Sequence, residues 1–173
     1  MANIYTRPAQ MNDLPMIMKI IAGAKEFLKA SGSPQWQTGY PATSDIELDI
    51  KNSHAYVLLV AGQVVGYAAV VIGNEPTYHT ITKGSWANTA DPYATIHRMA
   101  ISQDFRGQHL SHFFMTNIIT LMASQGITNI RLDTYRLNQP VQKIAAKFDF
   151  SQRGEILVDD PLDPRRIAFE LNL

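Results

Sequence analysis

The spacing of apolar residues along the chain predicts two long amphipathic helices. Apolar positions recur every three or four residues between 14 and 30 and again between 109 and 124, which is the repeat of a helix with one buried face. Gly126 follows the second segment and is typical of a helix C-cap. The apolar positions of the first helix are Leu14, Ile17, Met18, Ile21, Ala24 and Leu28.

Two shorter segments are predicted helices because of their capping residues. Ser44 and Glu47 match a capping box that opens a helix over residues 44–50. Asn138 precedes Pro140, and a proline is tolerated in the first helical turn, so a further helix is predicted over residues 138–147.

Runs rich in Val, Ile and Tyr predict the strands of a sheet. They cover residues 4–7, 55–60, 63–72, 93–101, 129–134, 155–158 and 167–171. Ala61 and Gly62 are a hairpin turn between the second and third runs. Residues 73–92 hold Gly, Pro, Thr, Asn and Asp and predict a long loop, a kind of segment that is often functional. Hairpins combined with one strand–helix–strand crossover predict an α/β fold, with a mixed sheet and helices on both faces.

The charge balance and length restrict the class of protein. The chain has 173 residues, which fits one domain over residues 1–173. Lys and Arg total 15, as do Asp and Glu, so the net charge is zero. Without net positive charge the main driving force for binding nucleic acid or a membrane surface is missing, and we expect neither as a partner. A small-molecule or peptide substrate is therefore the expected partner.

The absence of cysteine excludes several kinds of chemistry. Disulfides, thiolate metal sites and a cysteine nucleophile are all ruled out. The five histidines do not combine with acids at zinc-like spacing, so no metal is expected. The first residues lack the basic segment and apolar run of a signal peptide, and we expect a cytoplasmic location.

The segment from Arg106 to Ser111 is the main candidate for chemistry. It joins a predicted strand to a predicted helix, where free backbone N–H groups and the helix dipole favour an anion such as a pyrophosphate. Arg106 adds a positive charge, and Gly107 allows close approach of the backbone. On this local pattern alone, a plain strand–turn–helix joint with an exposed arginine stays an equal alternative.

The order of short motifs along the whole chain resembles the GNAT superfamily of acyl-CoA N-acetyltransferases. The segment from Arg106 to Ser111 resembles its pyrophosphate loop. The other motifs, in chain order, are Arg7-Pro8-Ala9 with Asp13, Val64-Val65-Gly66-Tyr67-Ala68, His97-Arg98-Met99-Ala100-Ile101, Arg131-Leu132-Asp133-Thr134, Asn138, and Lys147-Phe148-Asp149-Phe150. The resemblance implies a GNAT-like, mostly antiparallel central sheet whose fourth and fifth strands splay apart.

The resemblance also implies a reaction and a cosubstrate. A primary amine of a small molecule or peptide would attack the thioester of acetyl-CoA directly, which makes the chain an acyl-CoA-dependent N-acetyltransferase. The pantetheine arm of the coenzyme would lie in the gap between the splayed strands. The residues implied for coenzyme A binding are Met99, Ala100, Ile101, Arg106, Gly107, Gln108, His109, Leu110, Ser111 and Asn138.

The catalytic groups are harder to assign. His97 is the first candidate base, because it lies on the strand beside the expected thioester and titrates near neutral pH. Strand alternation would place His97, Met99 and Ile101 on one face, and a hydrogen-bonded core histidine stays an equal alternative. Tyr135 is a candidate acid, because Ala145 stands where the family often has a tyrosine. A partly buried aromatic residue is the alternative interpretation of Tyr135.

Aromatic residues in two flanking segments are candidates for the acceptor pocket. Trp36 and Tyr40 precede the second helix, and Tyr78 and Trp86 lie in the long loop. Ordinary packing is the alternative for each of them.

Two other functions are weighed against the enzyme. A non-catalytic acyl-CoA-binding or regulatory module on the same fold is suggested by His109 and Ala145. A nucleotide-binding domain that uses the same loop is disfavoured, because the glycine-rich fingerprint and the P-loop lysine are missing. The oligomeric state stays open, with a homodimer as one option.

Overall fold

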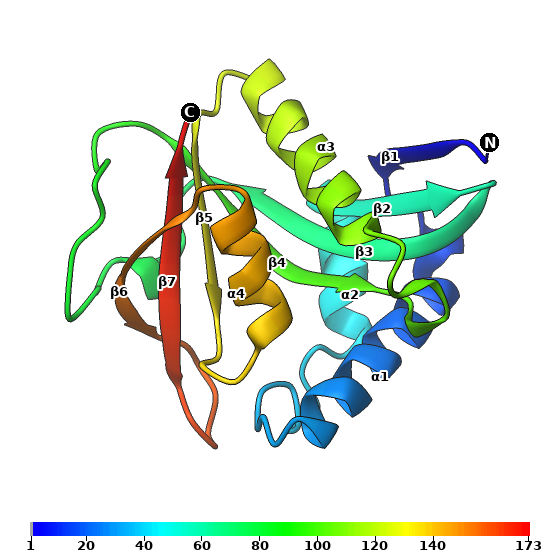
Figure 1. Cartoon of the computed structure of the whole chain (residues 1–173), viewed down its shortest axis with the longest axis horizontal. Coiled ribbons are helices and arrows are strands. Elements are labelled where there is room, and N and C mark those ends of the chain that lie inside the picture. The colour runs from blue at the N-terminus through cyan, green and yellow to red at the C-terminus, as the bar shows by residue number, and fades with distance from the viewer. Residues whose placement is uncertain (1) are drawn as a thin grey trace.

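A seven-stranded sheet forms the centre of the molecule (Figure 1). The computed structural model describes residues 2–173, so Met1, which the expected domain includes, lies outside the described residues. The strand order is β1-β2-β3-β4-β5-β7-β6, in which β4 and β5 run parallel and the other five neighbouring pairs run antiparallel. The strands are β1 Ile4–Pro8, β2 Ala55–Val60, β3 Gln63–Ile72, β4 Tyr93–Ile101, β5 Asn129–Thr134, β6 Ser151–Leu157 and β7 Arg165–Asn172.

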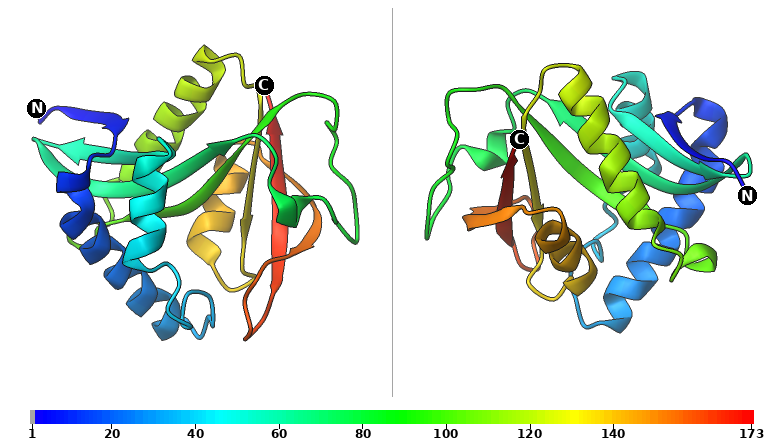
Figure 2. Two further views of the ribbon diagram at one scale, coloured as in Figure 1. Left: turned by 180° about the vertical axis from the view of Figure 1, so that it is seen from behind. Right: turned by 45° about the horizontal axis from the view of Figure 1, so that its top comes forward.

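Helices cover both faces of this sheet, as the two further views show (Figure 2). Helices α1 (Leu14–Ala30) and α2 (Thr43–Lys51) pack on one face, and α3 (Leu110–Ser124) and α4 (Gln139–Lys147) pack on the other. Alternate residues of a strand point to opposite faces, so each central strand supplies both cores. The predicted mixed α/β fold with helices on both faces is confirmed.

The strand predictions are confirmed where local signals were strong. Strands β2, β3, β4 and β5 have the predicted bounds, and Ala61 and Gly62 both adopt positive φ (50° and 81°) in the hairpin turn between β2 and β3. The predicted capping box of α2 is wrong. Helix α2 begins two residues after Pro41, and the Asp45 carboxylate accepts a hydrogen bond from the amide of Ala42 (2.6 Å).

The long loop over residues 73–92 is anchored on the sheet. It contains a short 3-10 turn at Pro76–Tyr78, and Thr82 exchanges two backbone hydrogen bonds with Glu155 (2.8 Å each), which covers part of the edge of β6. The amide of Ala87 donates to the buried carboxylate of Glu170 (2.8 Å). These contacts hold the loop against the sheet.

Strand β4 contains a bulge just beyond the end of its pairing with β5. Ala69 lies opposite His97 and Tyr67 lies opposite Ala100, so two residues of β4 face one residue of β3. The parallel pairing of β4 with β5 stops at Ile96, and the two strands diverge beyond it (Figure 1).

The bulge changes the direction of the side chains that follow it. Met99 and Ile101 pack with the α3 cluster and Ala100 packs with the α1 cluster. His97 instead contacts Glu75 of the long loop, and ring centroids of His97 and Tyr78 lie 6.4 Å apart. The regular alternation predicted for His97 and Met99 is therefore wrong, because the extra residue at the bulge reverses it.

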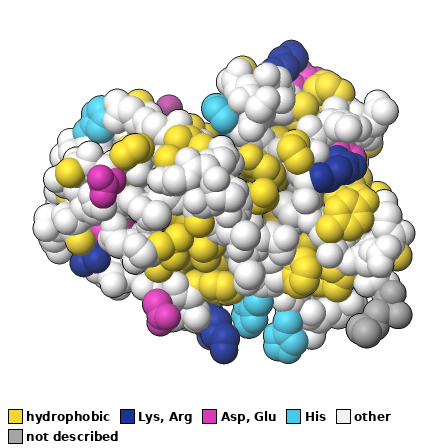
Figure 3. Space-filling model, turned by 90° about the horizontal axis from the view of Figure 1, so that it is seen from above, with side chains coloured by type: hydrophobic (Ala, Val, Ile, Leu, Met, Phe, Trp, Pro, Cys, Tyr) yellow, Lys and Arg dark blue, Asp and Glu magenta, His cyan; other side chains and the backbone are white. Residues whose placement is uncertain are grey.

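Apolar side chains on the surface are dispersed. Figure 3 shows them in several patches on the face seen from above, interrupted by polar, charged and histidine side chains. Scattered apolar side chains are normal on a folded protein, so this face does not indicate an interface, and a homodimer stays one option for the oligomeric state. Within residues 2–173 no helix has the length and apolar character needed to cross a membrane.

Candidate active site

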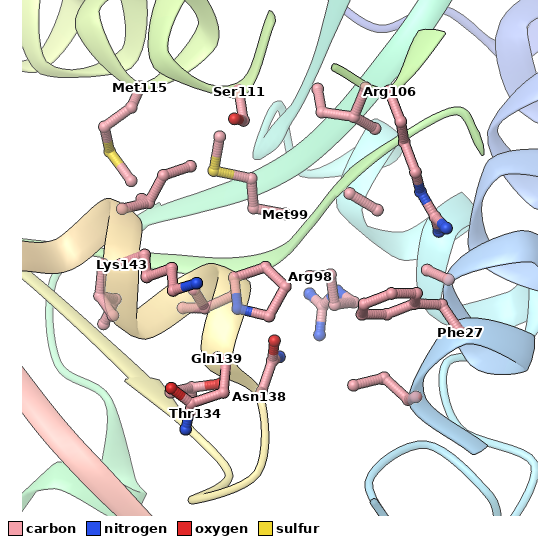
Figure 4. Close-up of a pocket in the computed structure, with 18 of the residues that line it drawn as sticks. Phe27, Arg98, Met99, Arg106, Ser111, Met115, Thr134, Asn138, Gln139 and Lys143 are labelled. Atoms are coloured by element: carbon pink, nitrogen blue, oxygen red, sulfur yellow. The ribbon is translucent and has the colours of Figure 1, made fainter. Parts of the chain in front are cut away.

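A long cavity opens where β4 and β5 diverge. Its volume is about 870 Å³, and its walls come from the C-terminal half of α1, the β4–α3 loop, the end of β5 and the start of α4. Figure 4 shows Met99, Met115 and Ser111 on the α3 side, with Asn138 across the cavity at the start of α4. The cavity therefore joins both faces of the gap in the sheet.

The loop between β4 and α3 presents free backbone amides to this cavity. Among the described residues, none of the amide N–H groups from Gly107 to Ser111 donates a hydrogen bond within the protein. Gly107 (φ 78°) and His109 (φ 56°) both adopt the left-handed conformation, which is typical of concave nests of N–H groups. The positive end of the 15-residue helix α3 lies directly behind them. This loop can bind a diphosphate.

Arg106 places a positive charge beside the same amides. Its guanidinium lies 4.5 Å from the ring centroid of Phe27 in α1, and both side chains border the cavity (Figure 4). The aromatic face orients the cation without neutralising it.

The edge of β4 supplies further backbone groups. Within residues 2–173, β4 has no strand partner on the β5 side from His97 onward, and Met99, Ala100 and Ile101 line the cavity. An extended ligand in this gap can bond to the strand edge as an added strand would.

Asn138 bridges the cavity to the segment between α1 and α2. It is the N-cap residue of α4, as predicted, but its side chain makes no capping hydrogen bond. Its amide instead donates to Oε1 of Gln35 (3.3 Å) across the cavity.

A second, short cavity lies on the other side of the gap. Its volume is about 400 Å³, and it contains Tyr40, Glu75 and His97 in its wall. The two cavities meet where β4 and β5 separate, and five residues line both of them. These shared residues are Gln35, Trp36, Ile96, Arg98 and Asp133. A ligand in one cavity can therefore reach a ligand in the other at the gap.

His97 and Glu75 form a pair in the short cavity. Nε2 of His97 lies 3.1 Å from Oε2 of Glu75, and both side chains are largely buried. The hydrogen bond with His97 lowers the pKa of Glu75 to about 2. An ionised Glu75 can accept a hydrogen bond from Nε2 of His97, which leaves Nδ1 as the ring nitrogen able to accept a proton. This arrangement is that of an oriented base.

Asp133 lies at the junction of the two cavities. The hydroxyl of the fully buried Tyr78 donates to its Oδ1 (2.8 Å). Burial raises the pKa of the Asp133 carboxyl, while nearby His97 and the Tyr78 hydroxyl act in the opposite direction. Because Asp133 lines both cavities, its carboxyl can accept a hydrogen bond from an amine or a water at the junction.

The His97–Glu75 pair makes a stability contribution that depends on pH. Because the folded-state pKa of Glu75 lies below its ordinary value of 4.5, this contribution is present above pH 4.5 and is lost as the pH falls toward 2. Screening of a partly exposed pair reduces its size to about 1–2 kcal/mol. The variant Glu75→Gln should lose less unfolding free energy between pH 5 and pH 3 than the wild type in urea titrations. Equal losses would contradict the assigned pair.

The structure brings most of the sequence-predicted residues to the two cavities. Nine of the ten residues proposed for coenzyme A line the long cavity, and Gln108 is the exception. Trp36 lines both cavities, and Tyr40 and His97 line the short one.

Three predicted aromatic residues lie elsewhere. Tyr78 (1% exposed) and Trp86 (9% exposed) of the long loop stack on each other, with ring centroids 5.2 Å apart, and pack in the core against Ile156 and Ala168. They line neither cavity. The Tyr135 hydroxyl donates to Oδ2 of Asp163 (3.1 Å), and Tyr135 also lines neither cavity. Burial under neighbouring segments explains all three positions.

Comparison with known proteins identifies the family. The model of the Acetyltransferase (GNAT) family matches residues 21–150, which is well over half of the chain. The chain belongs to the GNAT acetyltransferase family. A solved GNAT-family acetyltransferase from Streptococcus agalactiae 2603 is 33% identical, with a TM-score of 0.89 over 98% of this chain and 95% of that chain. No curated protein sequence matches the chain significantly.

More distant GNAT structures share the fold. A GNAT-family acetyltransferase from Listeria monocytogenes 4b F2365 is 21% identical, with a TM-score of 0.75 over 98% of this chain and 95% of that chain. A PaiA N-acetyltransferase from Thermoplasma acidophilum, solved in complex with coenzyme A, is 15% identical, with a TM-score of 0.70 over 99% of each chain. The predicted mixed, mostly antiparallel GNAT sheet is confirmed.

Sequence reasoning missed several residues of this GNAT site. Gln35 reaches Asn138 from 103 positions away, and Asp49 reaches Arg98 from 49 positions away. Such contacts leave no local pattern. The one available signal was Arg98 itself, a charged residue within an otherwise apolar strand.

Proposed function

We propose that the chain transfers an acetyl group from acetyl-CoA to a primary amine of a small molecule or peptide, and that residues 1–173 form one N-acetyltransferase domain. The observation that carries this proposal is the row of five free amides from Gly107 to Ser111 at the mouth of a gap between two strands. Family membership supports acetyl transfer as the reaction.

The described residues fit coenzyme A. Five unpaired N–H groups at a helix N-terminus, with Arg106 beside them, match the charge of a diphosphate. Met99, Ala100, Ile101 and Asn138 would hold the pantetheine arm along the unpartnered edge of β4. The bound thioester supplies an activated acetyl group. The PaiA structure with coenzyme A supports the same use of this fold.

The short cavity is suited to the acceptor amine. A simple alkyl amine has a pKa of about 10.4 and arrives protonated at neutral pH, so the site must remove a proton. We assign this role to His97, which Glu75 orients through its hydrogen bond. Asp133 would bind the ammonium or a water at the junction, and Tyr40 and Trp36 would form the wall around the acceptor.

The leaving thiolate needs little help from the protein. A free thiol has a pKa near 8.5, so thiolate is a fair leaving group near neutral pH. Ala145 is fully buried and cannot donate a proton. Tyr135 would need to leave its hydrogen bond with Asp163 to act as an acid.

A panel assay tests the proposal. Purified protein is mixed with acetyl-CoA and a set of primary amines and peptides, and free thiol is measured against the rate without amine. We expect amine-dependent thiol release for at least one member and an acetylated product by mass spectrometry. Coenzyme A binding with no turnover across the panel would favour the non-catalytic module instead, and no binding at all would reject both.

A further inference from the structure

The bulge in β4 requires an unusual backbone conformation at an arginine. Ala68 of β3 faces both Arg98 and Met99, and Arg98 adopts φ 56°. Residues other than Gly, Asn and Asp rarely adopt this left-handed conformation. Other contacts must therefore hold the backbone of Arg98 in it. The pairing between β4 and β5 ends at Ile96, two residues before Arg98. The gap that forms the site therefore begins at the bulge.

The side chain of Arg98 is fixed by a carboxylate on α2. Its Nε and Nη2 donate to the two oxygens of Asp49 (2.9 and 2.6 Å), and Asp49 is 5% exposed. The buried Tyr67 hydroxyl donates to the same carboxylate. Paired hydrogen bonds between a guanidinium and a carboxylate are strong and directional. These hydrogen bonds thus connect the bulge in β4 to α2, a helix that lines neither cavity.

The same guanidinium reaches the acceptor side. Nη1 of Arg98 donates to the hydroxyl of Tyr40, and the guanidinium carbon lies 5.7 Å from the centroid of the Tyr40 ring. Arg98 lines both cavities, and Tyr40 lines the short one. A single side chain thereby connects the bulge with a wall of the acceptor cavity.

We propose that Asp49 is a positioning residue: through Arg98 it holds β4 in the bulged conformation that keeps β4 and β5 apart. Without this pair, the strained backbone at Arg98 relaxes and the gap narrows. The inference rests on the proposed function, because that gap is where the pantetheine arm would lie.

A matched pair of variants tests the role of Asp49. The chain contains a second paired Arg–Asp contact, in which Nη1 and Nη2 of Arg7 donate to the two oxygens of Asp13 (2.7 and 2.9 Å), and neither residue lines a cavity. Both Asp49→Asn and Asp13→Asn should lower the melting temperature. Calorimetric titration with coenzyme A should show at least tenfold weaker binding for Asp49→Asn and a change of less than twofold for Asp13→Asn. Equal effects on binding would overturn the proposal.

Two substitutions of Arg98 test whether the Asp49–Arg98 pair acts through the backbone conformation at the bulge. They also provide a test if Asp49→Asn does not fold. Arg98→Ala and Arg98→Gly both leave Asp49 unpaired, but only glycine adopts positive φ without strain. Arg98→Gly should therefore bind coenzyme A several-fold more tightly than Arg98→Ala, with a lower KM for acetyl-CoA.

Different results of these binding experiments would reject the role of Asp49 and the proposed function. Equal affinities for the two Arg98 variants would show that the pair does not act through the bulge. Failure of the wild-type protein to bind coenzyme A would instead reject the proposed function.

Discussion

Replacing His97 with glutamine is expected to lower kcat by about 10²- to 10³-fold, within the range for loss of a general base. His97 lines the short cavity, and its Nε2 is held by the ionised Glu75, so Nδ1 is the atom left to accept a proton. The loss should shrink as the pH rises from 7 to 9.5, because more of the amine is then already neutral. Initial rates at saturating acetyl-CoA across this range measure both effects.

A second histidine provides the control for this experiment. His54 lies in the turn before β2 and lines neither cavity, so His54→Gln should retain wild-type rates. Coenzyme A affinity should be unchanged in both variants, since neither residue lines the long cavity. A His97→Gln enzyme with full activity at pH 7, or with a deficit that does not change with pH, would remove His97 from the mechanism.

The second large effect, a loss of coenzyme A affinity, is expected when a negative charge is placed beside the free amides of residues 107–111. Ser111 is the second residue of α3, where an aspartate is favourable for the helix because it interacts with the positive end of the dipole. The same negative charge would repel a bound diphosphate. Two unit charges about 4 Å apart interact by about 4 kcal/mol at an effective dielectric constant of 20. With screening, about 2–3 kcal/mol remains, so Ser111→Asp should weaken coenzyme A binding roughly 30- to 150-fold.

The equivalent position of another helix supplies a matched control. Ser44 is the second residue of α2 and lines neither cavity, so Ser44→Asp should leave binding unchanged. Both variants should keep or slightly raise the melting temperature. Calorimetric titration and thermal unfolding separate the two effects. Unchanged affinity in Ser111→Asp would show that the diphosphate does not bind at this loop.

The fold was predictable wherever local chemistry determines it. The hairpin of β2 and β3 follows from two runs rich in Val, Ile and Tyr on either side of Ala61 and Gly62, which adopt the positive φ that the turn requires. The start of α2 was misplaced because the acid that bonds back to the start of the helix is Asp45 and not Glu47, and the sequence alone does not rank these two acids. Tertiary packing decides between such signals.

The site was only partly predictable. The loop from Arg106 to Ser111 is contiguous in sequence, so its role as an anion site could be inferred from residue types. The bulge at Arg98 could not, because nothing in an arginine indicates positive φ, and its support comes from Asp49 on a distant helix. For the same reason Tyr78 and Trp86 could not be assigned to the core, since their burial depends on how a 20-residue loop folds onto the sheet.

A crystal structure of the protein with coenzyme A would show directly where the cosubstrate binds. We expect the diphosphate against the amides of residues 107–111, with the pantetheine arm between β4 and β5 and its thiol end near Asp133. A diphosphate bound away from this loop, or β4 and β5 paired beyond Ile96 so that the gap is closed, would contradict this expectation.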